Sequence, residues 1–294
     1  MTFAVCDIGS NTIKMKIYSY SDTLKEEYSE VCNAKLISYI KDRVLSKEGT
    51  QLLCDTVARF KSRAELLNVK DFYAFATASL RRIDSFDEVA KTVLKETGVK
   101  IDLVSGDDEA YFSFVGVKSS MDAFPNDCIM LDMGGGSTEI VVVKDGEKNE
   151  SHSMNFGSLS LFLECQSFND MQNFALSRLD ECIKDRKNTD YAILVGGTAL
   201  AINKIYKHCF SEENDFSMNI EKLSALYSFL TTNEKERQAL LEKLVPERIT
   251  TVVPGMAAFV AIFNDFGVKN IFVSTKGIRE GYALERIIKN TEKN

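Results

Sequence analysis

The chain has few of the residues that mark linkers, metal clusters and histidine-based catalysis. It contains 3 Pro among 294 residues, no Ser-, Gly- or Pro-rich tract, and no apolar run long enough for a bilayer. We therefore expect neither linkers nor disordered tails nor membrane spans. Asp7 interrupts the N-terminal apolar segment, which argues against a signal peptide. These features predict a cytoplasmic globular protein.

Cysteine, histidine and charge narrow the chemistry further. The 7 Cys are dispersed, odd in number and never in C-x-x-C spacing, which suits neither a disulfide framework nor a zinc site. Only His152 and His208 are present, and neither lies near a glycine-rich turn, so histidine-based chemistry would be hard to build. A formal net charge of −7 argues against passive binding to nucleic acid or acidic membranes. Catalysis is therefore expected to use carboxylates.

Alternating strand-like and helix-like segments predict an α/β fold with two similar lobes. The hydrophobic content of 45% can fill a core in one large domain or two ordinary ones. A capping-box pattern, Ser85 with Glu88, marks the start of one helix. Periodicity and turn residues predict strands at 3–6, 12–20, 71–79, 100–106 and 268–275, and helices at 46–69, 85–98, 107–121, 221–244, 247–267 and 279–290.

We place the boundary between the lobes near residue 119. The expected domains are an N-terminal lobe over 1–119 and a C-terminal lobe over 120–294, which carries a helical insert. The last helix, about 280–294, is expected to pack back on the first lobe.

A glycine-rich turn interrupts a hairpin at residues 128–147. An apolar run ends at Asp132, three glycines follow, and Ser137-Thr138-Glu139 begins a second apolar run. The segment "VCDIGSNTIKMKIY" repeats this plan, with Asp7 aligned on Asp132, Gly9 on Gly134, and Ser10 and Asn11 on Gly135 and Gly136. Two such copies indicate an internal duplication. A third turn, Gly196-Gly197-Thr198, lies between an expected strand and an expected helix.

The chemistry of these turns suits phosphate. Glycine lets backbone N–H groups approach a ligand without a Cβ, and arrays of N–H groups bind phosphate. Asp7, Asp132 and Glu139 would repel bare phosphate but suit Mg²⁺ placed between protein and phosphate. A single G-G-G turn is equally consistent with a flexible hairpin or bulge. Three turns, two of them with the same Asp, favour the phosphate site, although none is a Walker loop.

Six motifs carry a resemblance to a known family. "DIGSNTIK", "ATASLRR", "LVSGDDEA", "LDMGGGSTEIVV", "VGGTA" and "KGIREG" resemble, in order and spacing, the motifs of the Ppx/GppA phosphatases, from about residue 3 to about residue 288. The resemblance implies two ribonuclease-H-like lobes of the actin/hexokinase/Hsp70-like superfamily, with the active site in an interlobe cleft. It also implies hydrolysis of terminal phosphoanhydride bonds of polyphosphate, guanosine pentaphosphate or both, with Mg²⁺ or another divalent cation. Homodimers are a habit of that family.

The resemblance assigns roles to individual positions. Glu109 matches the general base, although from the residues alone it is one of three acids at a helix N-terminus, with Asp107 and Asp108. Arg81 matches an arginine suited to bidentate phosphate contact. Asp132 and Glu139 match Mg²⁺-binding residues, and Asp7 is the duplicate of Asp132. The expected phosphate-binding residues are Ser10, Asn11, Gly134, Gly135, Ser137, Gly197 and Thr198.

Three positions depart from the family pattern. Tyr111 and Lys35 stand where the family has Arg, and Thr275 stands where it has Asp. These departures keep open a sensor of phosphate compounds that has little turnover. An actin-like or sugar-kinase-like ATPase is a third interpretation. No C-terminal helical domain follows the closing helix, so we expect the short, two-lobe form, acting on short polyphosphates or a nucleotide.

Overall fold

The computed structural model describes residues 1–184, 186–211 and 216–291. Unit 1 comprises Met1–Glu109 and the chain from Tyr282 onward, and unit 2 comprises Ala110–Gly281. The boundary falls ten residues before position 119, because Ala110, Phe114 and Val117 pack in a core cluster of unit 2. The closing segment returns to unit 1 from Tyr282, and the last three residues of the helix expected over 280–294 lie outside the described residues.

The described residues of unit 1 form a five-stranded sheet in the order β3-β2-β1-β6-β7. Strands β1, β2 and β3 are antiparallel neighbours, whereas β6 and β7 run parallel to β1. Their bounds are β1 Thr2–Ile8, β2 Ile13–Tyr20, β3 Leu24–Cys32, β6 Asp71–Ala76 and β7 Ile101–Leu103. The first hairpin was therefore predicted correctly, while the predicted strand 71–79 ends at Ala76 and gives way to a short helix, α2 (Ala78–Arg81).

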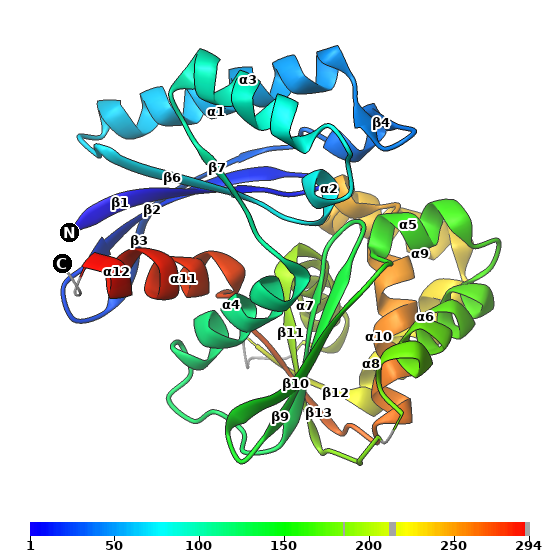
Figure 1. Ribbon diagram of the computed structural model, residues 1–294. Coiled ribbons are helices and arrows are strands. Elements are labelled where there is room, and N and C mark those ends of the chain that lie inside the picture. The colour runs from blue at the N-terminus through cyan, green and yellow to red at the C-terminus, as the bar shows by residue number, and fades with distance from the viewer. Residues whose placement is uncertain (185, 212–215, 292–294) are drawn as a thin grey trace. The chain divides into compact units, whose positions relative to one another are not determined.

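Helices α1 (Lys47–Leu66) and α3 (Phe86–Thr97) cover one face of this sheet (Figure 1). The π-helix η3 (Ala283–Ile288) and helix α12 (Lys289–Thr291) lie along the opposite face. The apolar stripe of α1 packs in the core, as its spacing predicts. On the opposite face the ring of Tyr282 lies 4.6 Å from that of Phe75. A 3₁₀ turn, η1 (Leu36–Tyr39), and the short strands β4 (Ile40–Lys41) and β5 (Val44–Leu45) precede α1.

The predicted capping box at the start of α3 is wrong. Ser85 is the N-cap residue, but its backbone is not extended and its hydroxyl makes no cap hydrogen bond. Only its carbonyl accepts the N–H groups of Glu88 and Val89. The predicted helix end is confirmed, because Gly98 takes φ 70°, which favours glycine.

The described residues of unit 2 form a six-stranded sheet in the order β10-β9-β8-β11-β13-β12. As in unit 1, three antiparallel strands come first and the next two run parallel to the central strand. This shared order supports the duplication seen in the sequence. The bounds are β8 Cys128–Met133, β9 Thr138–Lys144, β10 Glu147–Met154, β11 Tyr191–Val195, β12 Ser217–Asn219 and β13 Asn270–Val273.

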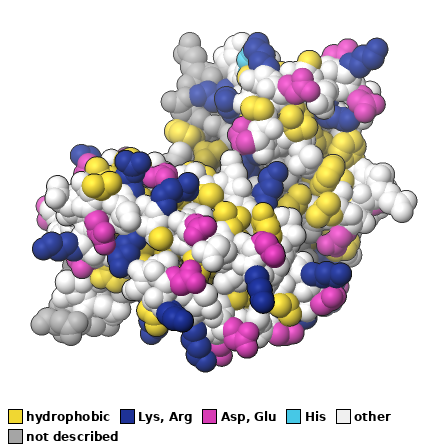
Figure 2. Space-filling view, turned by 90° about the horizontal axis from the view of Figure 1, so that it is seen from above, with side chains coloured by type: hydrophobic (Ala, Val, Ile, Leu, Met, Phe, Trp, Pro, Cys, Tyr) yellow, Lys and Arg dark blue, Asp and Glu magenta, His cyan; other side chains and the backbone are white. Residues whose placement is uncertain are grey.

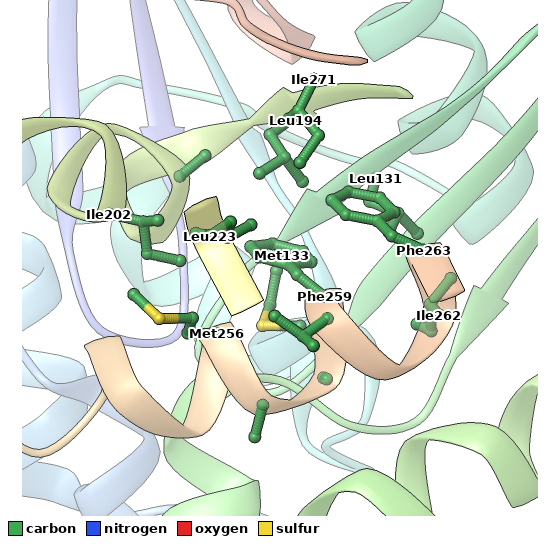
Figure 3. Packing of buried hydrophobic residues seen from close by; sticks show 14 of the residues in the cluster. Leu131, Met133, Leu194, Ile202, Leu223, Met256, Phe259, Ile262, Phe263 and Ile271 are labelled. Carbon is green, nitrogen blue, oxygen red and sulfur yellow. The ribbon is translucent and has the colours of Figure 1, made fainter. Parts of the chain in front are cut away.

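Helix α10 (Val252–Asp265) is the centre of the unit 2 core. Its residues from Val252 to Phe263 are all buried, and Figure 3 shows Phe259 and Phe263 beside Leu131 and Met133 of β8. The other helices on this unit are α4 Gly106–Lys118, α5 Ser158–Glu164, α6 Phe168–Cys182, α7 Gly196–Phe210, α8 Ile220–Thr232, α9 Glu234–Leu244, η2 Pro246–Arg248 and α11 Ile278–Tyr282. The helix predicted over 221–244 is thus two helices that meet at Asn233.

Two glycines, Gly116 and Gly281, let α4 and α11 approach closely. A Cβ on Gly281 would lie 1.8 Å from the carbonyl oxygen of Phe112, and one on Gly116 would lie 2.0 Å from that of Gly277. Any side chain at these positions would force the two segments apart. Among the described residues, no helix has the length and apolarity needed to cross a membrane.

Candidate functional site

The predicted site residues follow the carboxyl ends of parallel strands in each unit. In unit 1, Ser10 and Asn11 lie in the turn after β1, Arg81 in the short helix α2 after β6, and Glu109 in the first turn of α4 after β7. In unit 2, the loops after β8 and β11 carry the turns at Gly134 and Gly196. Ligands bind at this edge of open α/β sheets, because parallel strands bring successive loops together there.

The two hairpin turns have the same local geometry. The N–H of Gly9 donates to the carbonyl of Thr12 at 3.1 Å, and the N–H of Gly134 donates to the carbonyl of Ser137 at 2.9 Å. Gly9 corresponds to Gly134, as the alignment of the two segments predicts. The shared hydrogen bond therefore confirms that the two segments are structural copies.

A neighbouring segment holds the unit 1 turn. The N–H of Lys35 donates to the carbonyl of Asn11 at 2.8 Å, and the N–H of Ile37 donates to the carbonyl of Ser10 at 3.0 Å. Lys35 has φ 47°, in the left-handed region, and its side chain is exposed. Lys35 therefore brings a cationic residue to the predicted phosphate-binding pair.

Glu109 differs from the two acids that precede it. Glu109 is 8% exposed, and its Oε2 accepts a hydrogen bond from Nη1 of Arg81 at 2.9 Å. The same nitrogen of Arg81 donates to the carbonyl of Val104 at 2.8 Å. Asp107 is exposed, and Asp108 pairs with Arg286 at 3.4 Å. Among the three acids, Glu109 is thus the buried carboxylate with a fixed orientation, at the start of α4.

Asp132 and Glu139 lie directly opposite each other on β8 and β9. Opposed residues of an antiparallel pair point to the same face, so the two carboxylates share one face of the sheet. The hydroxyl of Ser113 donates to Oδ2 of Asp132 at 2.6 Å, and that of Ser153 donates to Oε1 of Glu139 at 2.8 Å. Glu139 is 3% exposed. Asp7, the third predicted carboxylate, belongs to unit 1, where Lys14 is its cross-strand partner.

This carboxylate pair fits Mg²⁺. In the part of the chain that the structure describes, no group of three or more His, Cys, Asp or Glu side chains is placed to hold a metal ion by itself. Mg²⁺ commonly binds through one or two carboxylates and completes its shell with water and phosphate oxygens. Two carboxylates on one face of the sheet meet that requirement.

Helix α5 fixes the glycine turn of unit 2. The carbonyl of Gly134 accepts the N–H of Ser158 at 3.0 Å, and that of Gly135 accepts the N–H of Leu159 at 3.0 Å. In a trans peptide the next N–H points away from the carbonyl, so the N–H groups of Gly135 and Gly136 point away from α5. Gly157 packs so closely that a Cβ there would lie 2.5 Å from the carbonyl oxygen of Gly134. Sequence reasoning missed Gly157, whose role depends on this contact.

Two of the hydroxyl residues near the unit 2 turns, Thr138 and Thr198, donate to protein groups. Thr138 donates to the carbonyl of Phe156 at 2.8 Å. Thr198 is 1% exposed and donates to Oγ of Ser158 at 3.3 Å, which links the α7 turn to the α5 N-terminus. Ser137 is buried as well. Thr198 thus supports the turns through Ser158, and its contact with phosphate stays a prediction.

Arg248 is a second residue that sequence reasoning missed. A Cβ on Gly197 would lie 2.1 Å from Nη2 of Arg248, so the glycine makes room for the guanidinium at the N-terminus of α7. Burial lowers the pKa of Arg248 below its ordinary value, against the opposing effect of Glu247. No described carboxylate forms an ion pair with this guanidinium. On the face shown in Figure 2, cationic and acidic side chains are interspersed. Anion binding would therefore depend on individual cations in fixed positions rather than on a broad basic patch.

The duplicated hairpin turns, the carboxylates beside them and the two-unit α/β fold define a class of phosphate-handling α/β protein. The family model described as the Ppx/GppA phosphatase family matches residues 29–290. The chain belongs to this family of phosphatases.

Individual relatives agree with the assignment. The guanosine-5'-triphosphate,3'-diphosphate pyrophosphatase of Pseudoalteromonas translucida is 25% identical over 95% of this chain, which spans 58% of that protein. Exopolyphosphatase 1 of Mycobacterium leprae is 22% identical over 98% of this chain and 90% of its own. The crystal structure of the Aquifex aeolicus family member has the same fold, with a TM-score of 0.83, 20% identity and coverage of 99% of this chain and 98% of that one. The predicted α/β fold with two lobes is therefore confirmed.

Proposed function

We propose that the protein hydrolyses the terminal phosphoanhydride bond of inorganic polyphosphate, guanosine pentaphosphate or both, in a divalent-cation-dependent reaction that releases orthophosphate. The names of relatives at 22% and 25% identity motivate both substrates. The observation that carries the proposal is the Glu109 carboxylate, which is buried in the first turn of α4 and accepts a hydrogen bond from Arg81. A buried carboxylate with a fixed orientation suits a general base.

The glycine turn after β8 and the start of α7 bind the phosphate chain in this proposal. The N–H groups of Gly135 and Gly136, turned away from α5, and the N-terminus of α7 donate to phosphate oxygens. Arg248 adds a cation that is already partly desolvated, so contact with an anion would replace water at small further cost. Asp132 and Glu139 would hold the divalent cation, which when bound would lower the negative charge of the phosphate oxygens.

Glu109 is the general base in this proposal. Glu109 accepts a proton from water as the water oxygen bonds to the terminal phosphorus in line with the bridging oxygen. The bond from phosphorus to that bridging oxygen then breaks, and the leaving group is a phosphate chain one unit shorter. Arg81 keeps the carboxylate in one orientation, while Ser10 and Asn11 offer short donors at the turn after β1. No covalent enzyme intermediate is required.

The direct test is orthophosphate release in Mg²⁺ from tripolyphosphate, long-chain polyphosphate and guanosine pentaphosphate. Glu109→Gln should lower kcat by about 10²–10⁴-fold, because the amide cannot accept the proton, while substrate affinity stays near the parent value. Asp107→Asn is the matched control, since this exposed acid lies in the same helical turn and should keep its activity. Parental turnover by Glu109→Gln would rule out the assigned base. Asp132→Asn should raise the Mg²⁺ requirement.

A phosphate-compound sensor is the second candidate. Two features favour a sensor. Tyr111, which stands where the family has Arg, is half-buried beside Phe112, and the Glu109 carboxylate is already paired with Arg81. The same assay distinguishes the two. If parent and Glu109→Gln both bind the substrates and neither releases orthophosphate, the sensor is supported and the phosphatase proposal fails.

A further inference from the structure

We infer that Ser113 is a positioning residue that orients the Asp132 carboxylate for the divalent cation and thereby sets the affinity of the site. The inference rests on the proposed function, in which Asp132 is a cation ligand. It concerns a residue that lies on α4, away from the glycine motifs, and that the sequence did not single out.

The environment of Asp132 is closely defined. Ser113 is 2% exposed, and its hydroxyl donates to Oδ2 of Asp132 at 2.6 Å. A Cβ on Gly277 would lie 3.8 Å from both this oxygen and the Ser113 hydroxyl. On the other side, a Cβ on Gly196 would lie 2.9 Å from Oδ1. Glycine at both positions therefore leaves room for the carboxylate, and the Ser113 hydroxyl fixes one of its two oxygens.

The direction of this hydroxyl is unlike that of its helical neighbours. Serine on a helix often donates to a backbone carbonyl of the preceding turn. Ser119 and Ser120, at the end of α4, do so with the carbonyls of Gly116 and Val117 at 2.9 and 2.8 Å. Ser113 instead donates across to β8, although the residues on either side of it in sequence, Phe112 and Phe114, are buried and apolar. The α4 backbone thus places one buried donor on the carboxylate.

The chemistry of the contact explains its effect. A hydroxyl that donates to a carboxylate makes a short, strong hydrogen bond, and 2.6 Å lies at the short end of that range. Hydrogen bonds to ligating carboxylates fix their orientation, and loss of such a partner typically costs about 10–100-fold in metal affinity. The matching contact from Ser153 to Glu139 gives both proposed ligands a serine donor. We therefore expect Ser113 to act on cation affinity rather than on the chemical step.

The test measures Mg²⁺ binding without substrate, by isothermal titration calorimetry on the full chain, with Mn²⁺ and its paramagnetic resonance signal as a second probe. Ser113→Ala should weaken Mg²⁺ binding about 10–100-fold. Ser113→Thr restores the hydroxyl and should bind within about threefold of the parent. Ser119→Ala is the matched control, because it removes a hydroxyl that bonds only a backbone carbonyl of the same helix, and it should leave binding unchanged.

Phosphate release adds a second readout. The Mg²⁺ concentration for half-maximal release should rise in Ser113→Ala by the same factor as the dissociation constant, while kcat at saturating Mg²⁺ stays within about threefold. If Ser113→Ala does not fold, Ser113→Cys takes its place, since a thiol keeps the size but donates weakly, and at least tenfold weaker binding is expected.

Two results separate the failure of this inference from that of the proposed function. Parental Mg²⁺ affinity in folded Ser113→Ala or Ser113→Cys, with phosphate release intact in the parent, would overturn the role of Ser113 alone. A parent protein that neither binds Mg²⁺ nor releases orthophosphate would overturn the proposed function, and the inference with it.

Discussion

Replacement of Gly157 by alanine should displace the glycine turn of unit 2 without removing any polar group. The added Cβ would lie 2.5 Å from the carbonyl oxygen of Gly134, 2.5 Å from the carbonyl carbon of Gly135 and 2.6 Å from the nitrogen of Gly136. Ordinary contact begins at 3.4 Å, so the turn must retreat by about 0.9 Å. All three neighbours are backbone atoms, which cannot yield by changing a rotamer.

The expected magnitude follows from this displacement. Overpacking of this kind costs about 1–3 kcal/mol. Weakening the hydrogen bonds from Ser158 and Leu159 to the turn adds about 1 kcal/mol for each bond lost. With both bonds lost, we therefore expect the free energy of unfolding to fall by about 3–5 kcal/mol. A displacement near 1 Å at groups that position a substrate can lower the rate about 10²-fold, so kcat/KM for orthophosphate release should fall by about 10–100-fold.

The assay pairs urea unfolding with orthophosphate release from tripolyphosphate. Gly134→Ala is the matched control for folding, because its Cβ would lie 3.6 Å from the carbonyl oxygen of Ser137, in ordinary contact. We expect its unfolding free energy to stay within about 1 kcal/mol of the parent. If Gly157→Ala keeps both the stability and the kcat/KM of the parent, the turn does not depend on this contact and the reasoning is refuted.

Two further predictions concern Arg248 and Cys128. Arg248→Gln should raise KM about tenfold or more with little change in kcat, because it removes a partly desolvated cation. Arg178→Gln should not raise KM, because the Arg178 guanidinium is already paired with Glu181, and equal KM values for both variants would contradict the anion-binding role. Burial raises the pKa of the Cys128 thiol to about 12 from 9.0. The stability that the protonated Cys128 thiol contributes to the folded protein is thus complete below about pH 9. It is lost as the pH rises toward about 12, and the free energy of unfolding falls by up to about 1.4 kcal/mol per pH unit. Cys128→Ala should flatten the alkaline decline of unfolding free energy in urea titrations, and an unchanged slope would exclude this cause.

Several elements follow from the sequence because their causes are local. The alternation of Ile13, Met15 and Ile17 predicts β2, and these side chains are buried together in the unit 1 core. The Asp-Gly plan of the two hairpins predicts equivalent turns, and the matching hydrogen bonds of Gly9 and Gly134 confirm it. Gly98 ends α3 as predicted, since a left-handed residue at a helix end depends only on its neighbours.

Other features required the tertiary structure, because their causes join distant segments. The sequence offers three equivalent acids in the first turn of α4, and the approach of Arg81 from α2 distinguishes Glu109. Arg248 contacts the α7 N-terminus from η2, and Ser113 of α4 contacts Asp132 of β8. No local sequence pattern predicts either contact. Hydrophobic periodicity and turn residues predict the local structure of the segment in which they occur. Ion pairs, buried hydrogen bonds and close glycine packing depend on which segments meet, and the tertiary fold decides that.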